Sequence, residues 1–312
     1  MISIEMNGYN VYYYTDDNRW QKPVITEYRI LELFLLNKNV PYNYFAFPWA
    51  TFIDDFKFKG KLDLYNIITK YTPPTNCFTV IQHIYFRQFL FLCKQLKITH
   101  VFTPHRLASD DELEIKFNIK IIPLSLYPIY ENNPFIYKPL TERKYLTSFI
   151  GYTNRHYISD IRPKIFDIFT NHDDCFIRRT NVWHFNNFVY KNINSTNIEN
   201  EQLYVDTMRE TKFALCPSGS GPNSIRLWEA LSYGTIPVLL SDNFIMPLIE
   251  TEYKCIIFWK ESDFELLYEH LKNYDLEQIE EMSKNCIELY NTYFSKNTMN
   301  KCIVEYFIRN II

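Results

Sequence analysis

Glycine and alanine are the residues that this sequence uses least for its size. Six glycines stand in 312 residues, where average usage of about 7% would supply roughly 22. Alanine occurs at five positions, whereas tyrosine and phenylalanine occur 25 times each. A bias towards AT-rich codons explains that bulk composition. It does not explain why Gly219, Gly221 and Gly234 fall within one 16-residue window, so that window needs a local reason.

Long apolar runs and a leader sequence are also missing. No stretch approaches 18 uncharged apolar residues, and the first residues lack the basic and apolar regions of a signal peptide. We therefore expect a chain without a transmembrane segment that is not secreted and works in the cytoplasm of a microbe or an infected host cell.

Neither a strong charge nor a cysteine pattern is present. The net charge is −3, so no general basic field attracts nucleic acid, and we expect no nucleic-acid partner. The seven cysteines are odd in number, widely spaced and without a C-x-x-C pair. This spacing predicts reduced thiols and neither a disulfide framework nor a zinc site.

Short β-rich runs alternate with longer amphipathic stretches in both halves of the chain, a pattern typical of α/β folds with mainly parallel sheets. Four prolines between 123 and 139 interrupt it and indicate a crossover. We predict two α/β domains, 1–140 and 141–312, with a ligand cleft between them. The last helix could pack back on the N-terminal domain.

The glycine window lies in a strand–loop–helix–strand unit over 212–242. Its loop contains small and polar residues that bring the chain to a helix N-terminus, where free N–H groups and the helix dipole suit a phosphate. We predict that the loop binds an anion through Ser218, Gly219, Ser220, Gly221, Asn223 and Ser224. Ordinary turn and cap chemistry is the alternative interpretation of the same residues.

Two charged residues follow on the helix. Arg226 could donate charge-assisted hydrogen bonds to a diphosphate, and Glu229, one turn later, could accept two hydroxyl hydrogens from a ribose. An exposed i, i+3 ion pair is the alternative. The loop matches neither the Walker motif nor the dinucleotide motif, since position 224 is serine.

The same window resembles the C-terminal signature of exostosin-like glycosyltransferases (glycosyltransferase family 47). The matching positions are Cys216-Pro217-Ser218-Gly219, Ser224, Arg226-Leu227-Trp228-Glu229-Ala230-Leu231, Gly234, Ile236-Pro237-Val238 and Ser241-Asp242. The upstream segments 143–151 and 161–162 are similar to the family's opening strand and helix.

This resemblance implies two Rossmann-like domains of the GT-B type, with a nucleotide sugar on the C-terminal one. It implies transfer of a sugar, from a UDP-sugar by preference, to a glycan hydroxyl. Gly151 at a strand end, and Arg155 beyond it, would then serve the donor as well. No D-x-D motif occurs, so no metal is expected, and nothing else is expected as a cofactor. Gly221 stands eight positions before Glu229, where retaining enzymes have a second glutamate, so an inverting displacement fits better.

Inversion by single displacement needs a base that takes the proton of the acceptor hydroxyl. We expect it at the carboxyl ends of the N-terminal strands, and the candidates are Asp54 or its neighbour Asp55, His83 and His105, with Asp54 and His83 ahead of His105. Three aromatic residues could stack on sugar faces, namely Tyr42, Tyr44 and Trp49. Two other hypotheses stay open: a fucosyltransferase-type enzyme that uses GDP-fucose, and a glycan-binding protein without catalysis.

Overall fold

The computed structural model describes residues 1–21, 24–71, 76–132, 137–181 and 195–311. They form two compact units. Unit 1 comprises Met1–Tyr127, Phe244–Glu250 and Lys296–Ile312, and unit 2 comprises Pro128–Asn243 and Thr251–Ser295. The chain thus leaves unit 1 near residue 127, earlier than the predicted boundary at 140, and returns to it twice. The cleft expected between two domains stays a prediction.

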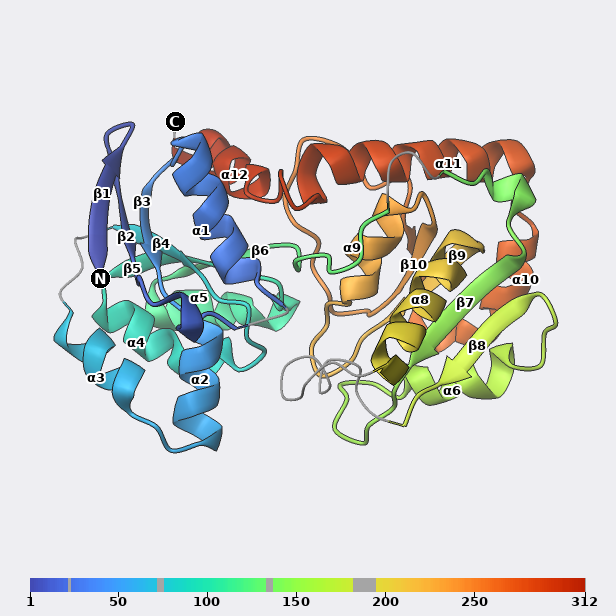
Figure 1. Cartoon of the computed structure of the whole chain (residues 1–312), viewed down its shortest axis with the longest axis horizontal. Coiled ribbons are helices and arrows are strands. Elements are labelled where there is room, and N and C mark those ends of the chain that lie inside the picture. Colours follow the sequence, from blue (N-terminus) through green and yellow to red (C-terminus); the bar gives the residue numbers. More distant parts are fainter. Residues whose placement is uncertain (22–23, 72–75, 133–136, 182–194, 312) are drawn as a thin grey trace. The chain divides into compact units, whose positions relative to one another are not determined.

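Unit 1 is built on a six-stranded sheet in the order β1-β2-β3-β4-β5-β6 (Figure 1). β1 and β2 are antiparallel, and the later neighbours are parallel. Asn7 and Gly8 both have positive φ and make the tight turn of the β1–β2 hairpin. The strands are β1 (Ile2–Met6), β2 (Tyr9–Tyr13), β3 (Asn43–Ala46), β4 (Cys77–Val80), β5 (Ile98–Thr103) and β6 (Lys120–Pro123).

The helices of unit 1 are α1 (Thr26–Asn37), α2 (Trp49–Phe58), α3 (Asp63–Lys70), α4 (Leu90–Gln95), α5 (Asp111–Phe117) and α12 (Lys301–Ile311). Aromatic side chains fill much of its core. The ring of Phe307 on α12 stacks on Tyr42 at 4.9 Å between centroids and also contacts Phe78. The C-terminal helix is therefore part of the hydrophobic core of unit 1.

Unit 2 has a five-stranded parallel sheet in the order β11-β10-β9-β7-β8. Its strands are β7 (Tyr145–Gly151), β8 (Cys175–Arg179), β9 (Thr211–Pro217), β10 (Ile236–Leu240) and β11 (Ile257–Phe258). Its helices are α6 (Ile161–Phe169), α8 (Ser195–Arg209), α9 (Ile225–Ser232), α10 (Leu267–Lys272) and α11 (Leu276–Leu289). Two parallel-sheet α/β units confirm the predicted fold class.

The end of α9 shows why the motif glycine is needed. Gly234 has a φ of +60°, and a Cβ there would lie 2.7 Å from Ser283 Oγ. The Ser283 hydroxyl donates to the Gly234 carbonyl at 2.7 Å. Arg143 lies close by and donates to the carbonyls of Tyr233 and Thr211. These bonds fix the turn from α9 into β10.

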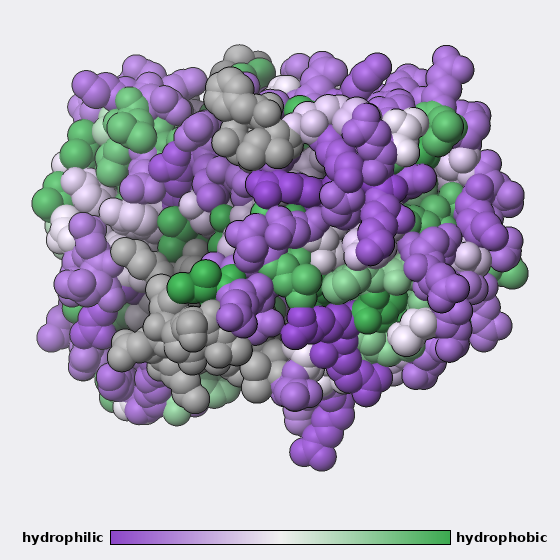
Figure 2. All heavy atoms as spheres, turned by 45° about the vertical axis from the view of Figure 1, so that its right-hand side comes forward, coloured by the Kyte–Doolittle hydropathy of each residue, from purple (hydrophilic) through white to green (hydrophobic). Residues whose placement is uncertain are grey.

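The face of the molecule drawn in Figure 2 is mainly polar. Hydrophilic side chains dominate it, and apolar side chains form small patches there. Among the described residues, no helix combines the length and the apolar character needed to cross a bilayer. All seven cysteines are free thiols and six are buried, which confirms that they form no disulfide framework.

Candidate functional site

The sheet of unit 2 has a topological switch point between β7 and β9. From β7 the chain adds β8 on one side, and it then returns to add β9, β10 and β11 on the other side. In open α/β sheets the loops after two such strands leave on opposite faces, so a ligand can bind at their carboxyl ends. β7 ends at Gly151 and β9 ends at Pro217, so the predicted loop 218–224 begins at this point.

Two guanidinium groups meet at the switch point. Arg226 on α9 donates to the carbonyl of Ile150 at the end of β7 and, at 3.2 Å, to the carbonyl of Leu215 on β9. Arg162 on α6 donates to the carbonyl of Ser218 at 2.7 Å and to that of Tyr152 at 3.0 Å.

Both guanidinium groups also lie close to one aromatic ring. The Cζ atoms of Arg226 and Arg162 are 4.5 and 5.6 Å from the centroid of the Phe149 ring. The aromatic ring and the carbonyl bonds therefore fix both cations near the start of the loop.

Neither arginine has an ion-pair partner in the part of the chain that the structure describes. Burial, followed by the positive charge of Arg226, lowers the pKa of Arg162 to about 10. Two cations that are close together and form no ion pair with a described carboxylate attract an anion, although the charge of Arg226 also acts on the buried Glu229. The site therefore has the electrostatics to hold a phosphate or diphosphate.

Two buried hydroxyl groups lie at the same edge of the sheet. Ser218 follows β9 and Ser241 follows β10, and Leu240 is in register with Pro217. The Ser218 amide donates to the Leu240 carbonyl at 3.0 Å. Neither Oγ atom has a hydrogen-bond partner among the described residues. Because an unpaired buried hydroxyl costs about 1–3 kcal/mol, such groups favour a polar ligand.

The rest of the loop leads into α9. Ser220 is exposed, and Ser224 is the N-cap residue but forms no side-chain cap bond. Asn223 accepts a hydrogen bond from Trp228 Nε1 at 3.0 Å, which fixes its side chain. The Gly219 amide donates to the Gly221 carbonyl at 3.0 Å. The loop is thus folded on itself beside the helix N-terminus.

Gly219 and Gly151 both make room for this cationic site. A Cβ at Gly219 would lie 3.0 Å from Arg162 Nη2, and one at Gly151 would lie 2.6 Å from the Phe149 ring. The space beside Gly219 is therefore occupied by Arg162 itself, and the space beside Gly151 by the Phe149 ring, which lies close to both cations. Close approach of a ligand to these two glycines stays a prediction.

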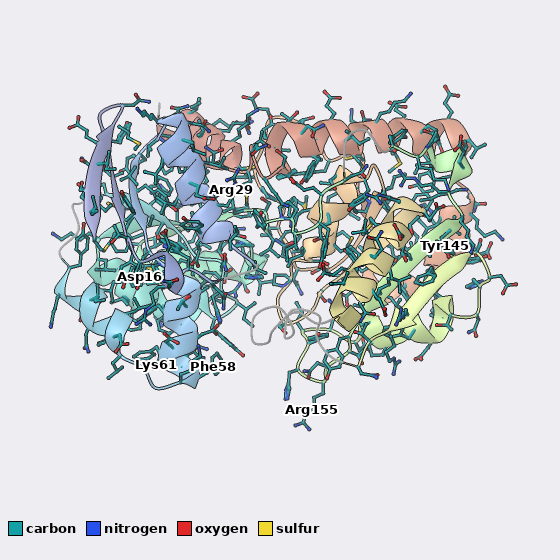
Figure 3. All side chains as sticks on the ribbon, in the orientation of Figure 1. Asp16, Arg29, Phe58, Lys61, Tyr145 and Arg155 are labelled. Carbon is teal, nitrogen blue, oxygen red and sulfur yellow. The ribbon has the colours of Figure 1, made fainter. Side chains whose placement is uncertain are left out.

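Arg162 occupies the place that the sequence analysis assigned to Arg155. Arg155 is exposed, donates to His156 Nε2 at 3.2 Å and extends away from the ribbon in Figure 3. No hydrogen bond or ion pair joins Arg155 to the loop among the described residues. The resemblance included position 162 in a matching segment, but nothing in the local pattern indicated that its side chain reaches the loop.

Glu229 is buried, with 3% of its surface exposed, and it already has three hydrogen bonds. Oε1 accepts from the amides of Ile129 and Tyr130 at 3.1 Å each, and Oε2 accepts from the Tyr204 hydroxyl at 2.6 Å. Burial raises the pKa of Glu229, and these hydrogen bonds oppose that shift. A carboxylate has about four acceptor positions. The expectation of two ribose hydroxyls on Glu229 therefore needs correction, since room for one remains.

In unit 1, two of the candidate bases form a pair. His83 Nε2 lies 3.0 Å from Asp54 Oδ1, while His83 Nδ1 accepts the Tyr85 amide at 3.1 Å. A nitrogen that accepts an N–H carries no proton in the neutral ring, so Nε2 is the protonated nitrogen and donates to Asp54. Gln21 donates to Asp54 Oδ2 at 2.6 Å. Both His83 nitrogens are thus occupied, whereas each Asp54 oxygen keeps one acceptor position.

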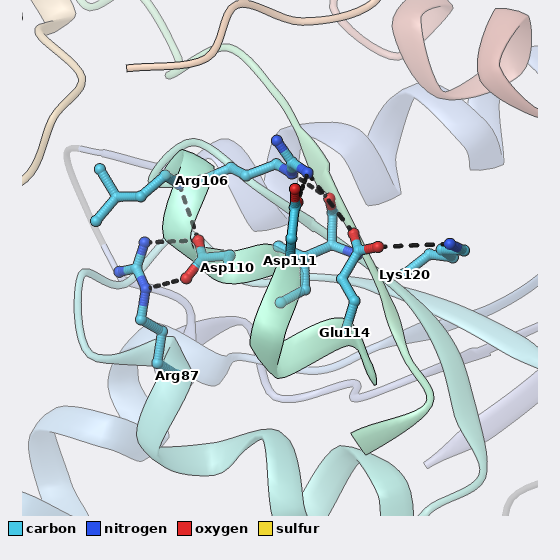
Figure 4. A network of polar contacts seen from close by, with 8 residues as sticks. Arg87, Arg106, Asp110, Asp111, Glu114 and Lys120 are labelled. Carbon is cyan, nitrogen blue, oxygen red and sulfur yellow. Dashed lines mark hydrogen bonds and ion pairs between the residues drawn. The ribbon is translucent and has the colours of Figure 1, made fainter. Parts of the chain in front are cut away.

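His105, the third candidate, is buried with 6% of its surface exposed, and its Nδ1 has no partner among the described residues. Burial, with the charges of His83 and Arg87 second, lowers the pKa of His105 to about 3. Arg87 donates to the His105 carbonyl at 2.5 Å and to both oxygens of Asp110 (Figure 4). The Arg87 bonds therefore hold the segment 105–110 in place. Because its pKa is low, the His105 imidazole is neutral near pH 7.

Glu27 has a buried carboxyl group that the sequence analysis missed. This residue is linked to Asp54 through the side chains of Gln82 and Gln21. Glu27 accepts the amides of Gln82 at 2.8 Å and Ala50 at 3.2 Å, and Gln82 Oε1 accepts the Glu27 amide. Burial raises the pKa of Glu27 to about 8. Gln82 Nε2 donates to Gln21 at 3.3 Å, and Gln21 donates to Asp54. This network orients Asp54.

No group of three metal-ligating side chains occurs among the residues that the structure describes. Metal independence stays a prediction.

Comparison with known proteins identifies the family of the chain. Residues 94–272, more than half of the chain, match the family model described as the exostosin GT47 domain. The chain belongs to the exostosin GT47 family of glycosyltransferases.

Two relatives illustrate the similarity of this exostosin GT47 chain to known proteins. An exostosin-1 homologue from Caenorhabditis elegans is 26% identical over 191 residues, which cover 56% of this chain and 50% of that protein. A probable glucuronosyltransferase, GUT1 from Oryza sativa, is 36% identical over 69 residues, covering 22% and 16%. The chain thus spans half or less of the length of these relatives.

Solved structures provide weaker likenesses for this exostosin GT47 chain. Anabaena HepE, solved with UDP, has a TM-score of 0.44 at 11% identity and covers 79% of this chain and 74% of HepE. A pneumococcal O-GlcNAc transferase, GtfA, solved with UDP and GlcNAc, has a TM-score of 0.43 at 12% identity, covering 90% and 60%. The fold assignment therefore rests on the strand order of the chain itself.

Proposed function

We propose that this chain is an inverting glycosyltransferase that transfers a sugar from a nucleoside-diphosphate sugar, with UDP as the favoured nucleotide, to a glycan hydroxyl. The observation that supports it is the pair Arg162 and Arg226, two cations that form no ion pair with any described residue and that lie beside the buried hydroxyls of Ser218 and Ser241, which have no partner among those residues. A leaving diphosphate gains negative charge as its bond to the sugar breaks, and fixed cations stabilise that charge.

Unit 1 supplies the base in this proposal. The acceptor oxygen attacks the anomeric carbon, the bond from that carbon to the diphosphate oxygen breaks, and the diphosphate leaves with the electron pair. The proton of the acceptor hydroxyl passes to Asp54, which keeps free acceptor positions. His83 is a positioning residue, because its Nε2–H fixes Oδ1 of Asp54.

Single displacement inverts the anomeric carbon, so product analysis tests the proposal. The full chain is incubated with UDP-sugars of α configuration and a panel of glycan acceptors, and the new linkage is assigned by NMR. We expect β-linked product and nearly equal rates with and without EDTA. An α-linked product would refute the inverting step, and full loss of activity in EDTA with recovery on adding magnesium would refute the metal-free mechanism.

The open alternatives predict different binding. A fucosyltransferase-type enzyme would bind GDP-fucose without binding UDP, and a non-catalytic protein would bind glycans without any nucleotide sugar. Calorimetric titration with UDP, GDP and their sugars separates the three.

A further inference from the structure

An exposed aromatic pair lies beside the Asp54–His83 pair of unit 1. Phe58, which lies at the end of α2 and is labelled in Figure 3, exposes 61% of its surface. Tyr85 exposes 36%. Their ring centroids are 5.9 Å apart, and the Tyr85 ring is 5.5 Å from the imidazole of His83. The Tyr85 ring thus lies next to His83, and the Phe58 ring lies next to Tyr85 at the surface.

Polar groups border these rings. Lys57 Nζ lies 4.0 Å from the Tyr85 centroid and 5.8 Å from that of Phe58, and it donates to Gln88 Oε1. We call Lys57, Phe58, Tyr85 and Gln88 the aromatic platform. It combines exposed ring surface with a cation that lies over one face of the Tyr85 ring and an amide beside that cation.

The platform differs from the aromatic residues that the sequence analysis favoured for sugar stacking. Trp49 and Tyr44 are fully buried, and Trp49 Nε1 donates to Thr79 Oγ1 at 2.8 Å. Tyr42 is partly buried and stacks on Phe307. Trp49 and Tyr44 therefore serve packing and are not available to a sugar, and one face of Tyr42 is taken by Phe307.

Tyr85 connects the platform directly to the candidate base. Its amide donates to His83 Nδ1 at 3.1 Å, and the same imidazole donates to Asp54. The Tyr85 backbone and the Asp54 carboxylate are therefore linked through one imidazole by two consecutive hydrogen bonds. A ligand on the platform would have its polar edge near Asp54.

A pyranose fits this arrangement chemically. One of its faces is lined with C–H groups that pack on aromatic rings, and its border carries hydroxyls that bond to groups such as an ammonium or an amide. Aromatic side chains that are exposed next to a polar pair are typical of binding surfaces.

We propose that the aromatic platform is the acceptor subsite, where a pyranose packs on Phe58 and Tyr85 with its reactive hydroxyl at Asp54. This inference rests on the proposed transferase function, because it assigns the surface to the acceptor of that reaction.

The test measures sugar binding apart from catalysis. Methyl β-glycosides of glucose, galactose, xylose and N-acetylglucosamine are titrated into the full chain with UDP present, and saturation-transfer NMR gives each affinity. Phe58→Ala and Tyr85→Ala should each weaken binding by roughly tenfold, and Tyr85→Phe should retain it because the ring face remains. Phe91→Ala is the matched control, since Phe91 on α4 exposes 52% of its surface.

The platform proposal fails if the wild-type chain binds none of the four glycosides, or if the two alanine variants bind as tightly as the wild type. UDP affinity is measured on the same samples by calorimetry. If the wild-type chain binds a glycoside but not UDP, the proposed donor chemistry is refuted. If the wild-type chain and both alanine variants bind UDP, and the variants also bind the glycosides as tightly as the wild type, only the platform is refuted.

Discussion

Arg162→Met should separate the stability of the chain from its affinity for a nucleotide. Methionine keeps the length of the alkyl chain and removes the charge. Since the pKa of Arg162 falls from 12.5 to about 10, holding this cation in the folded chain costs about 3 kcal/mol. Its two hydrogen bonds to the carbonyls of Ser218 and Tyr152 offset that cost by about 3 kcal/mol, at about 1.5 kcal/mol for each bond from a charged donor. The free energy of unfolding without ligand should therefore change by about 1 kcal/mol or less.

Affinity should change much more. A charge-assisted hydrogen bond to a phosphate contributes about 1.5–3 kcal/mol, so the Kd for UDP should rise by roughly 10- to 100-fold. Thermal unfolding with and without UDP, together with calorimetric titration, measures both quantities. Arg155→Met is the matched control, because Arg155 is exposed and should leave both unchanged. If Arg162→Met binds UDP like the wild type, or if Arg155→Met loses binding instead, the assignment of the cationic site is wrong.

Three further outcomes follow from the buried polar groups. Asp54→Asn should lower kcat by at least about 100-fold with little change in the KM for the donor, and steady-state kinetics would contradict the base assignment if kcat persisted. Glu229→Ala should lower the free energy of unfolding by about 3 kcal/mol, because it leaves two amides and a phenol unpaired. Tyr204→Phe removes only one of these bonds and should cost about 1 kcal/mol. Equal Tm values for the wild type and Glu229→Ala would disprove this. His105 binds a proton near pH 6.5 when unfolded but only near pH 3 when folded, so stability should fall as pH drops through this window by about 5 kcal/mol at most. His105→Gln should flatten that part of the denaturation profile, and an unchanged profile would show that another group is responsible.

The part of the site that the sequence predicted is local along the chain. β9, its loop, α9 and β10 follow one another within 211–240, so turn residues, helix periodicity and the stop at Gly234 all indicate the observed elements. Arg226 was predicted for the same reason. The Asn7-Gly8 turn was an equally local signal of the β1–β2 hairpin that the analysis did not use.

The remaining features depend on partners far apart in sequence. Arg162 reaches Ser218 across 56 positions, and Glu229 meets the amide of Ile129 across 100. No periodicity or spacing reports such contacts. Which tyrosines and phenylalanines are exposed also depends on tertiary packing, so Tyr85 and Phe58 could not be distinguished from Tyr44 by sequence.

The most direct test of the account is amide hydrogen exchange of the full chain with and without saturating UDP. The account predicts slower exchange in 150–162 and 218–226 and in the turn after β10, where the cations and the unpaired hydroxyls lie. Unchanged exchange in these segments, with UDP binding shown independently by calorimetry, would contradict the claim that the switch point of unit 2 binds the diphosphate.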